Sequence, residues 1–376
     1  MNFQLSEDQQ LIEQSARDFA KEYLDPIAGH LDQTGEFPND VVKELASHDF
    51  LGLHLPADVG GAEAGWVSYV AVIESLSRSC AAVASIMNNQ AIVSYAIHRW
   101  GNQTQIKRYL PALIKGEVVG AFAICEHGPT PGIGSGALVA TKKDGGYVLN
   151  GAKAYVRNAG VAGVYLVFAV TDTQDPKALT AFLVDANAKG VKVGELYKTM
   201  GLRGCPVADV VFNDVAVADA AVVGAVKGAG EIVTQTLALS SMAEAAQTVG
   251  IGQAAVEHAA AYSKQRVQFG RPVGTFQAVQ TLLAEVATDC HLARLGLHYT
   301  AQLIEDGKPF EAEAAQLKSF LVRFGSKMLI DTCQVEGGMG YSEAMPLPRM
   351  FRDIAGTTLL DAPADFPEEV IATSIA

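Results

Sequence analysis

The chain has 376 residues, of which 49% are hydrophobic and 18% are charged. This length suits two or three buried cores, and the composition indicates a globular protein with further burial in an oligomer. The formal net charge of −13 argues against binding to nucleic acids or to an anionic membrane surface, because both need a basic face.

The sequence also indicates where the protein works. We find no apolar signal segment at the N-terminus and no apolar run near the ~18 residues that span a bilayer. The five cysteines are odd in number and form no CxxC pair. We therefore expect reduced thiols, a cytoplasmic location and no metal site.

The first 117 residues show helical periodicity. Ser6 and Gln9 have the spacing of a capping box, and the apolar residues that follow lie on one helix face. The same period recurs in DVVKELASHDF, VSYVAVIESLSRS, residues 81–99 and TQIKRYLPALIKG. We predict a helical block that ends near residue 117.

The period changes near residue 118, where short apolar runs alternate with turn residues. The runs are GAFAIC, YVLNGAKAYV, VYLVFAV, LTAFLVD, VKVGELY and ADVVFNDVAV. Breakers such as Asp144-Gly145-Gly146 separate them, which is typical of strands in an antiparallel sheet or barrel. From about residue 225 the helical period returns, and we predict long helices over 228–264, 275–306 and 309–335.

Two segments of this last block are candidates for ligand binding. Residues 264–280, KQRVQFGRPVGTFQAVQ, place an arginine, a phenylalanine and a glycine at a break between two helices. Residues 334–353, QVEGGMGYSEAMPLPRMFRD, place a glycine pair directly after a helix, where a ligand can approach the backbone closely. Taken singly, each segment is also typical of a plain helix–helix corner or helix stop.

Taken together and in this order, the segments resemble the acyl-CoA dehydrogenase family. The resemblance extends over the whole chain and includes LSEDQQLIEQSARDF, LPADVGG, YVLNGAKAYVRNA, MGLRGCP and FNDVAV. It implies an α+β, mostly α-helical fold with an N-terminal helical domain (1–117), a central β-barrel (118–224) and a C-terminal four-helix bundle (225–376). It also implies FAD as the cofactor and a homodimer or homotetramer.

The residues that hold the ADP part of FAD in this family are kept. A diphosphate suits an arginine fork and close backbone donors, so it needs arginine and glycine. In the family, the arginine and phenylalanine of the RxQFG segment reach the cofactor across a subunit interface. The matching cofactor-binding residues are Arg266, Phe269, Gln277, Gln334, Gly337 and Gly338.

The residues around the flavin ring depart from the family pattern. The usual TEPxAGSD segment reads CEHGPTPGIGSGA at 125–137, so that Cys125 replaces a threonine, while Ser135 matches a serine that contacts pantetheine. The W-x-[ST] flavin contact reads Tyr155-Val156-Arg157, which keeps an aromatic ring but replaces a hydroxyl with a guanidinium. Arg157 near the flavin would stabilise negative charge or bind an acidic substrate group. The alternative is an arginine that turns outward to solvent.

The substrate site is altered as well. The aspartate and arginine that hold CoA in the family correspond to Ala238 and Ser241, which suits an acyl group on a carrier protein or a small substrate without CoA. Asn88 and Asn89 would add polar groups to a helix that lines the acyl pocket in the family, unless they serve to link helices. We expect a short or polar acyl thioester, with Ser135, Asn88, Asn89 and Ser241 as its contacts.

Two carboxylates are candidates for the catalytic base. The family's usual glutamate aligns with Asp361, whose shorter side chain loses about 1.5 Å of reach. The alternative there is a turn aspartate without a chemical role. Glu244 lies one helical turn beyond Ser240, where isovaleryl-type relatives place their base, and the alternative for Glu244 is a surface glutamate.

These residues lead to three hypotheses. The first is an FAD-dependent oxidoreductase that removes an α-proton from an acyl thioester and transfers hydride to FAD, with an electron-transferring flavoprotein or O2 as acceptor. The second keeps the fold and FAD without net dehydrogenation, as in desulfinase-like or nitroalkane-oxidase-like relatives. The third is a non-catalytic subunit of a mixed oligomer. Neither the acyl group nor the direction of reaction follows from the sequence.

Overall fold

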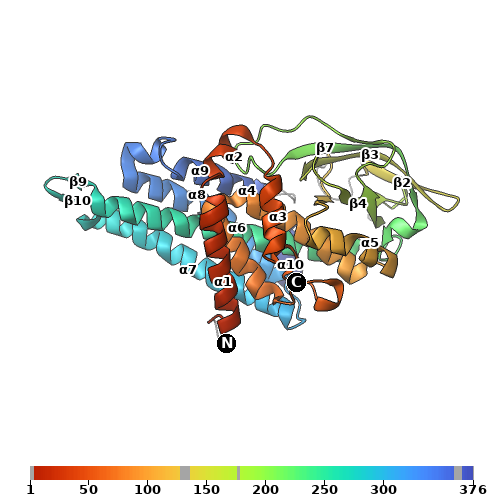
Figure 1. Ribbon diagram of the computed structural model, residues 1–376, viewed down its shortest axis with the longest axis horizontal. Coiled ribbons are helices and arrows are strands. Elements are labelled where there is room, and N and C mark those ends of the chain that lie inside the picture. The colour runs from red at the N-terminus through yellow and green to blue at the C-terminus, as the bar shows by residue number, and fades with distance from the viewer. Residues whose placement is uncertain (1–3, 128–135, 176–177, 360–365, 376) are drawn as a thin grey trace.

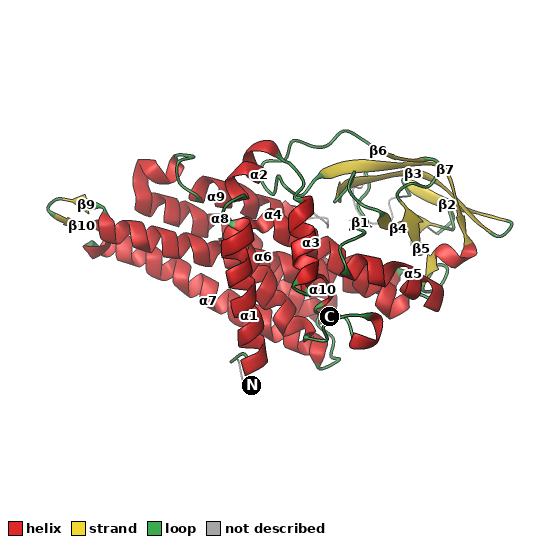
Figure 2. Cartoon of the chain, viewed as in Figure 1, coloured by secondary structure: helices red, strands yellow, loops and turns green. Residues whose placement is uncertain are grey.

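The computed structural model describes residues 4–127, 136–175, 178–359 and 366–375 (Figure 1). A block of strands lies between two blocks of helices, in the order that the sequence predicts. Figure 2 shows the sheet at one end of an elongated molecule and the long helices extending to the other end.

The N-terminal block is helical. It contains α1 (Glu7–Phe19), α2 (Ala28–Thr34), α3 (Asn39–Ser47), α4 (Gly65–Trp100) and α5 (Gln103–Ile114). The predicted capping box is present, because Ser6 and Gln9 exchange backbone-to-side-chain hydrogen bonds of 2.9 and 3.2 Å at the start of α1. A five-residue π-helix and α2 were not predicted, since segments of five and seven residues are too short to show a helical period.

α4 consists of two helical arms that fold back on each other at Cys80. Cys80 has the extended backbone angles φ −149° and ψ 95°, which interrupt a helix. The rings of Trp66 and Tyr95 lie 5.6 Å apart, whereas a continuous helix between them would span roughly 43 Å. The two helical patterns predicted in this region are therefore the two arms of one hairpin.

α4 is also long and apolar enough to cross a membrane by composition alone, with an 18-residue window of mean hydropathy 1.4. This corrects the expectation that no such run is present. In the structure 89% of that window is buried inside the protein, and the helix packs against α1, α6 and α7. The apolar composition of α4 is thus explained by its place in the helical core.

An eight-stranded sheet follows, in the order β6-β7-β3-β2-β4-β5-β8 with β1 beside β4. Its strands are β1 (Gly120–Ala123), β2 (Leu138–Lys143), β3 (Gly146–Arg157), β4 (Val164–Val170), β5 (Leu179–Asp185), β6 (Val191–Val193), β7 (Val207–Ala218) and β8 (Val222–Val223). Most neighbours run antiparallel as predicted, but β4 is parallel to both β1 and β2. β2 and β8 were not predicted, because β2 turns polar at its second half and β8 has only two residues.

The C-terminal block consists of long helices, as predicted. They are α6 (Gly230–Gln265), α7 (Gln277–Glu305), α8 (Glu311–Glu336), α9 (Leu347–Leu359) and α10 (Phe366–Ile375). α6 runs antiparallel to the second arm of α4, since Ser85 bonds to Gln247 and Tyr95 bonds to Gln235. Buried apolar side chains of α1, α4 and α6–α9 form one continuous core, and the sheet has a core of its own.

The break between α6 and α7 is a two-stranded hairpin rather than a helix–helix corner. β9 (Val267–Gln268) pairs with β10 (Arg271–Pro272) around the turn residues Phe269 and Gly270. Both turn residues have positive φ, 51° and 80°, as in a type I′ turn. A phenylalanine rarely adopts this conformation, so its presence at the turn indicates a function beyond the packing of its own chain.

His54 is an imidazole packed against the ring of Trp66 at the start of α4, with the ring centroids 4.6 Å apart. Both ring nitrogens are buried, and neither has a hydrogen-bond partner among the described residues. Burial, together with the nearby His98, lowers the pKa of His54 from 6.5 to about 3. The folded protein therefore holds the neutral imidazole, whereas the unfolded chain binds a proton once the pH falls below 6.5.

This difference predicts acid sensitivity. The contribution of His54 to stability is full above pH 6.5, and the free energy of unfolding falls by about 1.4 kcal/mol per unit as the pH drops below that value. His54→Phe keeps an aromatic ring and removes the titration. Urea denaturation at about pH 7.5 and about pH 5 should show a smaller loss for the variant than for the wild type. An equal loss in both proteins would contradict this account of His54.

Candidate active site

Five elements meet at the end of β3. Asn158 follows the last residue of β3, and its side-chain amide donates to the carbonyl of Gly120 at 3.0 Å and to that of Ile86 at 3.5 Å. These bonds attach the end of β3 to β1 and to the second arm of α4. α6, α8 and α9 complete the site through the contacts described next.

Arg157 and Glu244 form an ion pair that is closed to solvent. Both side chains are buried, and Nη2 of Arg157 donates to Oε1 of Glu244 at 2.5 Å. The two alternatives, an arginine turned outward and a surface glutamate, are therefore wrong. In a regular strand Arg157 would share a face with Tyr155, which is 47% exposed. A register shift between Lys153 and Val156, with a positive φ at Tyr155, turns Arg157 inward instead.

A second cation reaches the same carboxylate. Nζ of Lys318, on α8, donates to Oε2 of Glu244 and to the carbonyl of Thr357 near the end of α9. The hydroxyl of Thr248, one turn after Glu244, lies 3.0 Å from that of Thr357. Arg157, Glu244 and Lys318, hereafter the buried charge network, thus join β3, α6, α8 and α9. Sequence reasoning missed Lys318, although a lysine among the apolar residues of AAQLKSF is a signal for a buried partner.

Another buried ion pair fixes the two ends of segment 125–137, the segment that departs from the family pattern. Nζ of Lys153 donates to Glu126 at 2.6 Å and to the carbonyl of Ile124 at 3.1 Å. The other oxygen of Glu126 accepts the backbone N–H of Ala137 at 3.1 Å. Burial lowers the pKa of Lys153, while its partner Glu126 acts in the opposite direction. The pair therefore holds residues 124–126 and Ala137 against β3.

The predicted flavin-ring residues Cys125 and Tyr155 lie side by side. The carbonyl of Cys125 accepts the N–H of Ala154 at 2.8 Å, and Tyr155 follows directly. The exposed ring of Tyr155 contacts the rings of His127 and Tyr197 at centroid distances of 5.0 and 5.2 Å. The structure thus presents an open aromatic surface next to the buried charge network. His127 and Tyr197 were not among the predicted site residues.

Three consecutive amide side chains on α4, those of residues 88–90, differ in how fully they are hydrogen-bonded. Gln90 is a link, since its side chain bonds to the carbonyls of Leu113 and Val118 and to the N–H of Gly120. Asn89 bonds to the carbonyl of Ser85 at 3.2 Å and, at 3.5 Å, to the N–H of Phe122. Asn89 therefore bonds within α4 and to β1, whereas the alternative for these amides was to cap or link helices.

Asn88 differs from its two neighbours. Its oxygen accepts a long bond of 3.4 Å from the hydroxyl of Tyr69. Its Nδ2 is buried and has no hydrogen-bond partner among the described residues. Ala238 and Ser241, the other substrate positions on α6, are both buried. The contact of Asn88, Asn89 and Ser241 with a substrate stays a prediction.

The predicted ADP-binding residues form a separate, exposed group. The ring of Phe269 is 93% exposed at the tip of the β9–β10 hairpin. Gly337, at the end of α8, has φ 62° and ψ −137°, a conformation open essentially to glycine alone, and an added Cβ there would meet nothing within 4 Å. Arg266, Gln277, Gln334 and Gly338 are exposed as well. A guanidinium, an exposed ring and an uncovered glycine turn fit a ligand that carries a diphosphate and an aromatic base.

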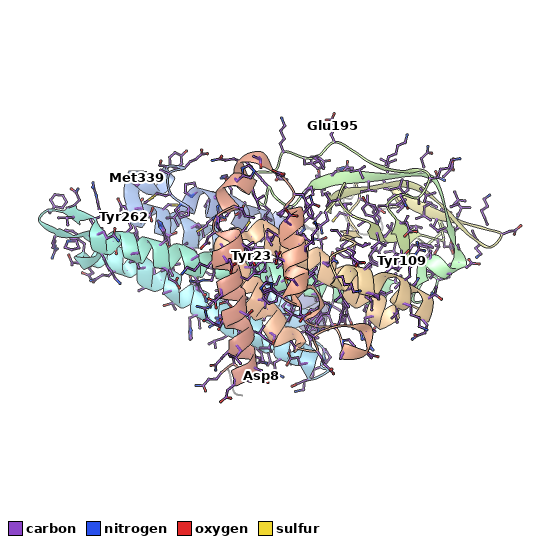
Figure 3. The ribbon with its side chains drawn as sticks, viewed as in Figure 1. Asp8, Tyr23, Tyr109, Glu195, Tyr262 and Met339 are labelled. Carbon is purple, nitrogen blue, oxygen red and sulfur yellow. The ribbon has the colours of Figure 1, made fainter. Side chains whose placement is uncertain are left out.

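The two groups lie far apart within one chain. Figure 3 labels Met339 and Tyr262, which mark the end with the hairpin, and Tyr109, which marks the sheet end. From Glu244 to the end of α6 the helix rises by roughly 30 Å. Within one chain, the charge network and the ADP residues are therefore separated by more than half the length of α6.

Two predicted residues, Asp361 and Ser135, lie outside the described residues. Lys318 donates to the carbonyl of Thr357, and Thr357 precedes Asp361 by four positions. Ala137, which Glu126 holds, follows Ser135 by two positions.

Comparison with known proteins decides the family. Models of the acyl-CoA dehydrogenase N-terminal, middle and C-terminal domains match residues 6–117, 121–215 and 228–375. The chain belongs to the acyl-CoA dehydrogenase family. It has the fold of that family, its cofactor is FAD, and it is an oxidoreductase that acts on CH–CH bonds.

Relatives cover almost the whole chain. The chain is 33% identical over 374 residues to a 3-(aryl)acrylate reductase from Clostridium sporogenes, covering 98% of this chain and 99% of that protein. It is 34% identical over 372 residues to an acyl-CoA dehydrogenase from Bacillus subtilis, with 98% of both chains covered. The solved structure of butyryl-CoA dehydrogenase from Megasphaera elsdenii superposes with a TM-score of 0.96 at 30% identity over 100% of both chains.

The buried charge network predicts a stability effect. Lys318→Met leaves Glu244 and the carbonyl of Thr357 without their shared donor, and we expect the free energy of unfolding to fall by about 3 kcal/mol. Lys327→Met is the matched control on the same helix, because Lys327 pairs with Glu285 and Asp331 in solvent. The control should lose about 0.5 kcal/mol or less. Equal losses in urea denaturation would show that the network does not hold α8 and α9 together.

Proposed function

We propose that the substrate is a short or polar acyl thioester, bound to CoA or to a carrier protein. The observation that carries this proposal is the buried amide of Asn88, whose Nδ2 has no partner among the described residues. The antiparallel register of α4 and α6 sets Asn88 at the level of Glu244 in the buried charge network. A long alkyl chain would leave the buried amide of Asn88 without a partner, which is unfavourable. Acyl-CoA chemistry is common to relatives named butyryl-CoA dehydrogenase and acryloyl-CoA reductase (NADH).

The reaction interconverts a saturated acyl group and its α,β-unsaturated form. Bound FAD supplies the hydride chemistry, and the chain's own residues hold and move the α-proton. We propose Asp361 as the base. Both carboxylate oxygens of Glu244 already accept bonds from cations, which supports an organising part for Glu244 rather than the part of the base. An electron-transferring flavoprotein or O2 would accept the electrons in the oxidative direction.

The cofactor site would be shared between two copies of the chain. Cys125, Tyr155 and Arg157 of one copy would hold the flavin end, while Arg266 and Phe269 of the other would hold the ADP end. The separation of these groups along α6 and the exposed, strained Phe269 support this arrangement. We accordingly propose a homodimer or homotetramer that works in the cytoplasm.

A second candidate is chemistry on a substrate other than a fatty acyl-CoA. The chain is 26% identical, at a TM-score of 0.94, to a structure titled PigA with FAD and proline, which covers 99% of that protein. The match favours a small polar substrate, as the proline in that title is. The non-dehydrogenating and non-catalytic alternatives have no observation of their own in the described residues.

Arg266→Ala tests the ADP site. Losing a charged hydrogen-bond donor to the diphosphate should weaken FAD binding by about 10- to 100-fold, so the purified variant loses its flavin absorbance on gel filtration. Arg271→Ala is the matched control, since the Arg271 guanidinium stacks on Phe276 at 4.1 Å within its own hairpin. Equal flavin content in both variants would remove Arg266 from the proposed site.

Asp361→Asn and Glu244→Gln together test the base. Asp361→Asn should keep FAD and slow the anaerobic bleaching of the flavin by an acyl thioester at least about 100-fold. Glu244→Gln should lower the thermal midpoint and change the rate less. Rapid bleaching in Asp361→Asn with none in a folded, flavin-loaded Glu244→Gln would move the base to Glu244.

A further inference from the structure

Two buried amides on neighbouring helices have unused hydrogen-bonding atoms. Nε2 of Gln247 on α6 and Nδ2 of Asn88 on α4 are buried and have no partner among the described residues. Both residues are almost completely inaccessible to solvent. Most buried side-chain amides in folded proteins are satisfied, so two such atoms in one place need an explanation.

The two amides belong to the same small region. The hydroxyl of Ser85 on α4 donates to Oε1 of Gln247 at 2.8 Å, which sets the two helices side by side at this level. Asn88 lies one turn after Ser85, and Glu244 lies one turn before Gln247. Because the helices run antiparallel, Asn88 and Glu244 lie at the same level along the helix axes, one turn from the Ser85–Gln247 bond.

The hydroxyls that contact the two amides are satisfied in either amide orientation. A serine or tyrosine hydroxyl can donate or accept, so rotating the amide of Gln247 or Asn88 exchanges which atom is bonded. Ser85 and Tyr69 can each satisfy one amide atom in either orientation. In the orientations of the structure, Nδ2 of Asn88 and Nε2 of Gln247 are the atoms without a partner among the described residues.

We propose that Asn88 and Gln247 receive a hydrogen-bonding substituent of the acyl group, such as a hydroxyl, amide or amine. The proposal rests on the proposed function and narrows its substrate class to short acyl groups with a polar end. Such a group would supply the missing partners of both amides, whereas an alkyl end of the same size would leave them unsatisfied. Gln247 thereby becomes a specificity-determining residue that the sequence did not reveal.

The preference for a polar acyl group can be measured directly. We would compare 4-hydroxybutyryl and pentanoyl pantetheine thioesters, which match in size and carry the part that CoA and carrier proteins share. The wild type should bleach its flavin with kcat/KM at least about 10-fold higher for the hydroxyl compound. Asn88→Leu should reduce that ratio to about one or reverse it. Gln247→Leu, combined with Ser85→Ala so that no hydroxyl is orphaned, should do the same.

Thermal stability separates this role from a structural one. Asn88→Leu combined with Tyr69→Phe, so that no hydroxyl is orphaned, should leave the melting temperature of the flavin-loaded protein unchanged or raise it. Gln90→Leu is the matched control on the same arm of α4, because all its polar atoms are bonded, and it should lower the melting temperature clearly. A loss in the Asn88→Leu, Tyr69→Phe double variant as large as that in Gln90→Leu would overturn the proposal.

Failure of this inference can be told apart from failure of the proposed function. Bleaching by both thioesters with pentanoyl preferred would leave the acyl-thioester activity in place and reject the polar substituent. No bleaching by either thioester in a flavin-loaded wild type would reject the acyl-thioester substrate, and this inference with it.

Discussion

The ion pairs among Arg157, Glu244 and Lys318 are the interaction on which the geometry of the site depends. Three ionised groups closed to solvent are stable only while they remain together, because each loses its hydration in the core. The three groups lie on β3, α6 and α8, and Lys318 also bonds to α9. The network therefore fixes the end of the sheet against the helical core. The inward turn of Arg157 in turn requires the irregular backbone at Tyr155.

A second constraint is the length of α6. The helix carries Glu244 at the charge network and leads to the β9–β10 hairpin at the far end of the molecule (Figure 1). The hairpin presents a strained, exposed phenylalanine that its own chain does not cover. A rigid helix of this length keeps the two groups of candidate FAD residues apart in one chain. The same rigidity would let two chains present complementary halves of a cofactor site to each other.

Local patterns predicted much of this structure. The order of helices and strands, the capping box at Ser6 and the long C-terminal helices follow from periodicity and from residue types at helix starts. The site was harder to predict, because its decisive features are contacts between distant segments. A strand register shift turned Arg157 inward, and neither it nor the partnership of Lys318 with Glu244 leaves a periodic signal. The plain helix–helix corner, one alternative for residues 264–280, does not describe the hairpin there, because the positive φ of Phe269 has no signal in the residue type.

Native mass spectrometry of the purified protein tests the central claim most directly, since it counts chains and cofactors in the same particle. The claim is that this chain builds FAD sites from two copies of itself. We predict particles with an even number of chains and one FAD per chain, and no monomer that carries FAD. Monomers loaded with FAD, or oligomers that hold none even after incubation with added FAD, would contradict the account.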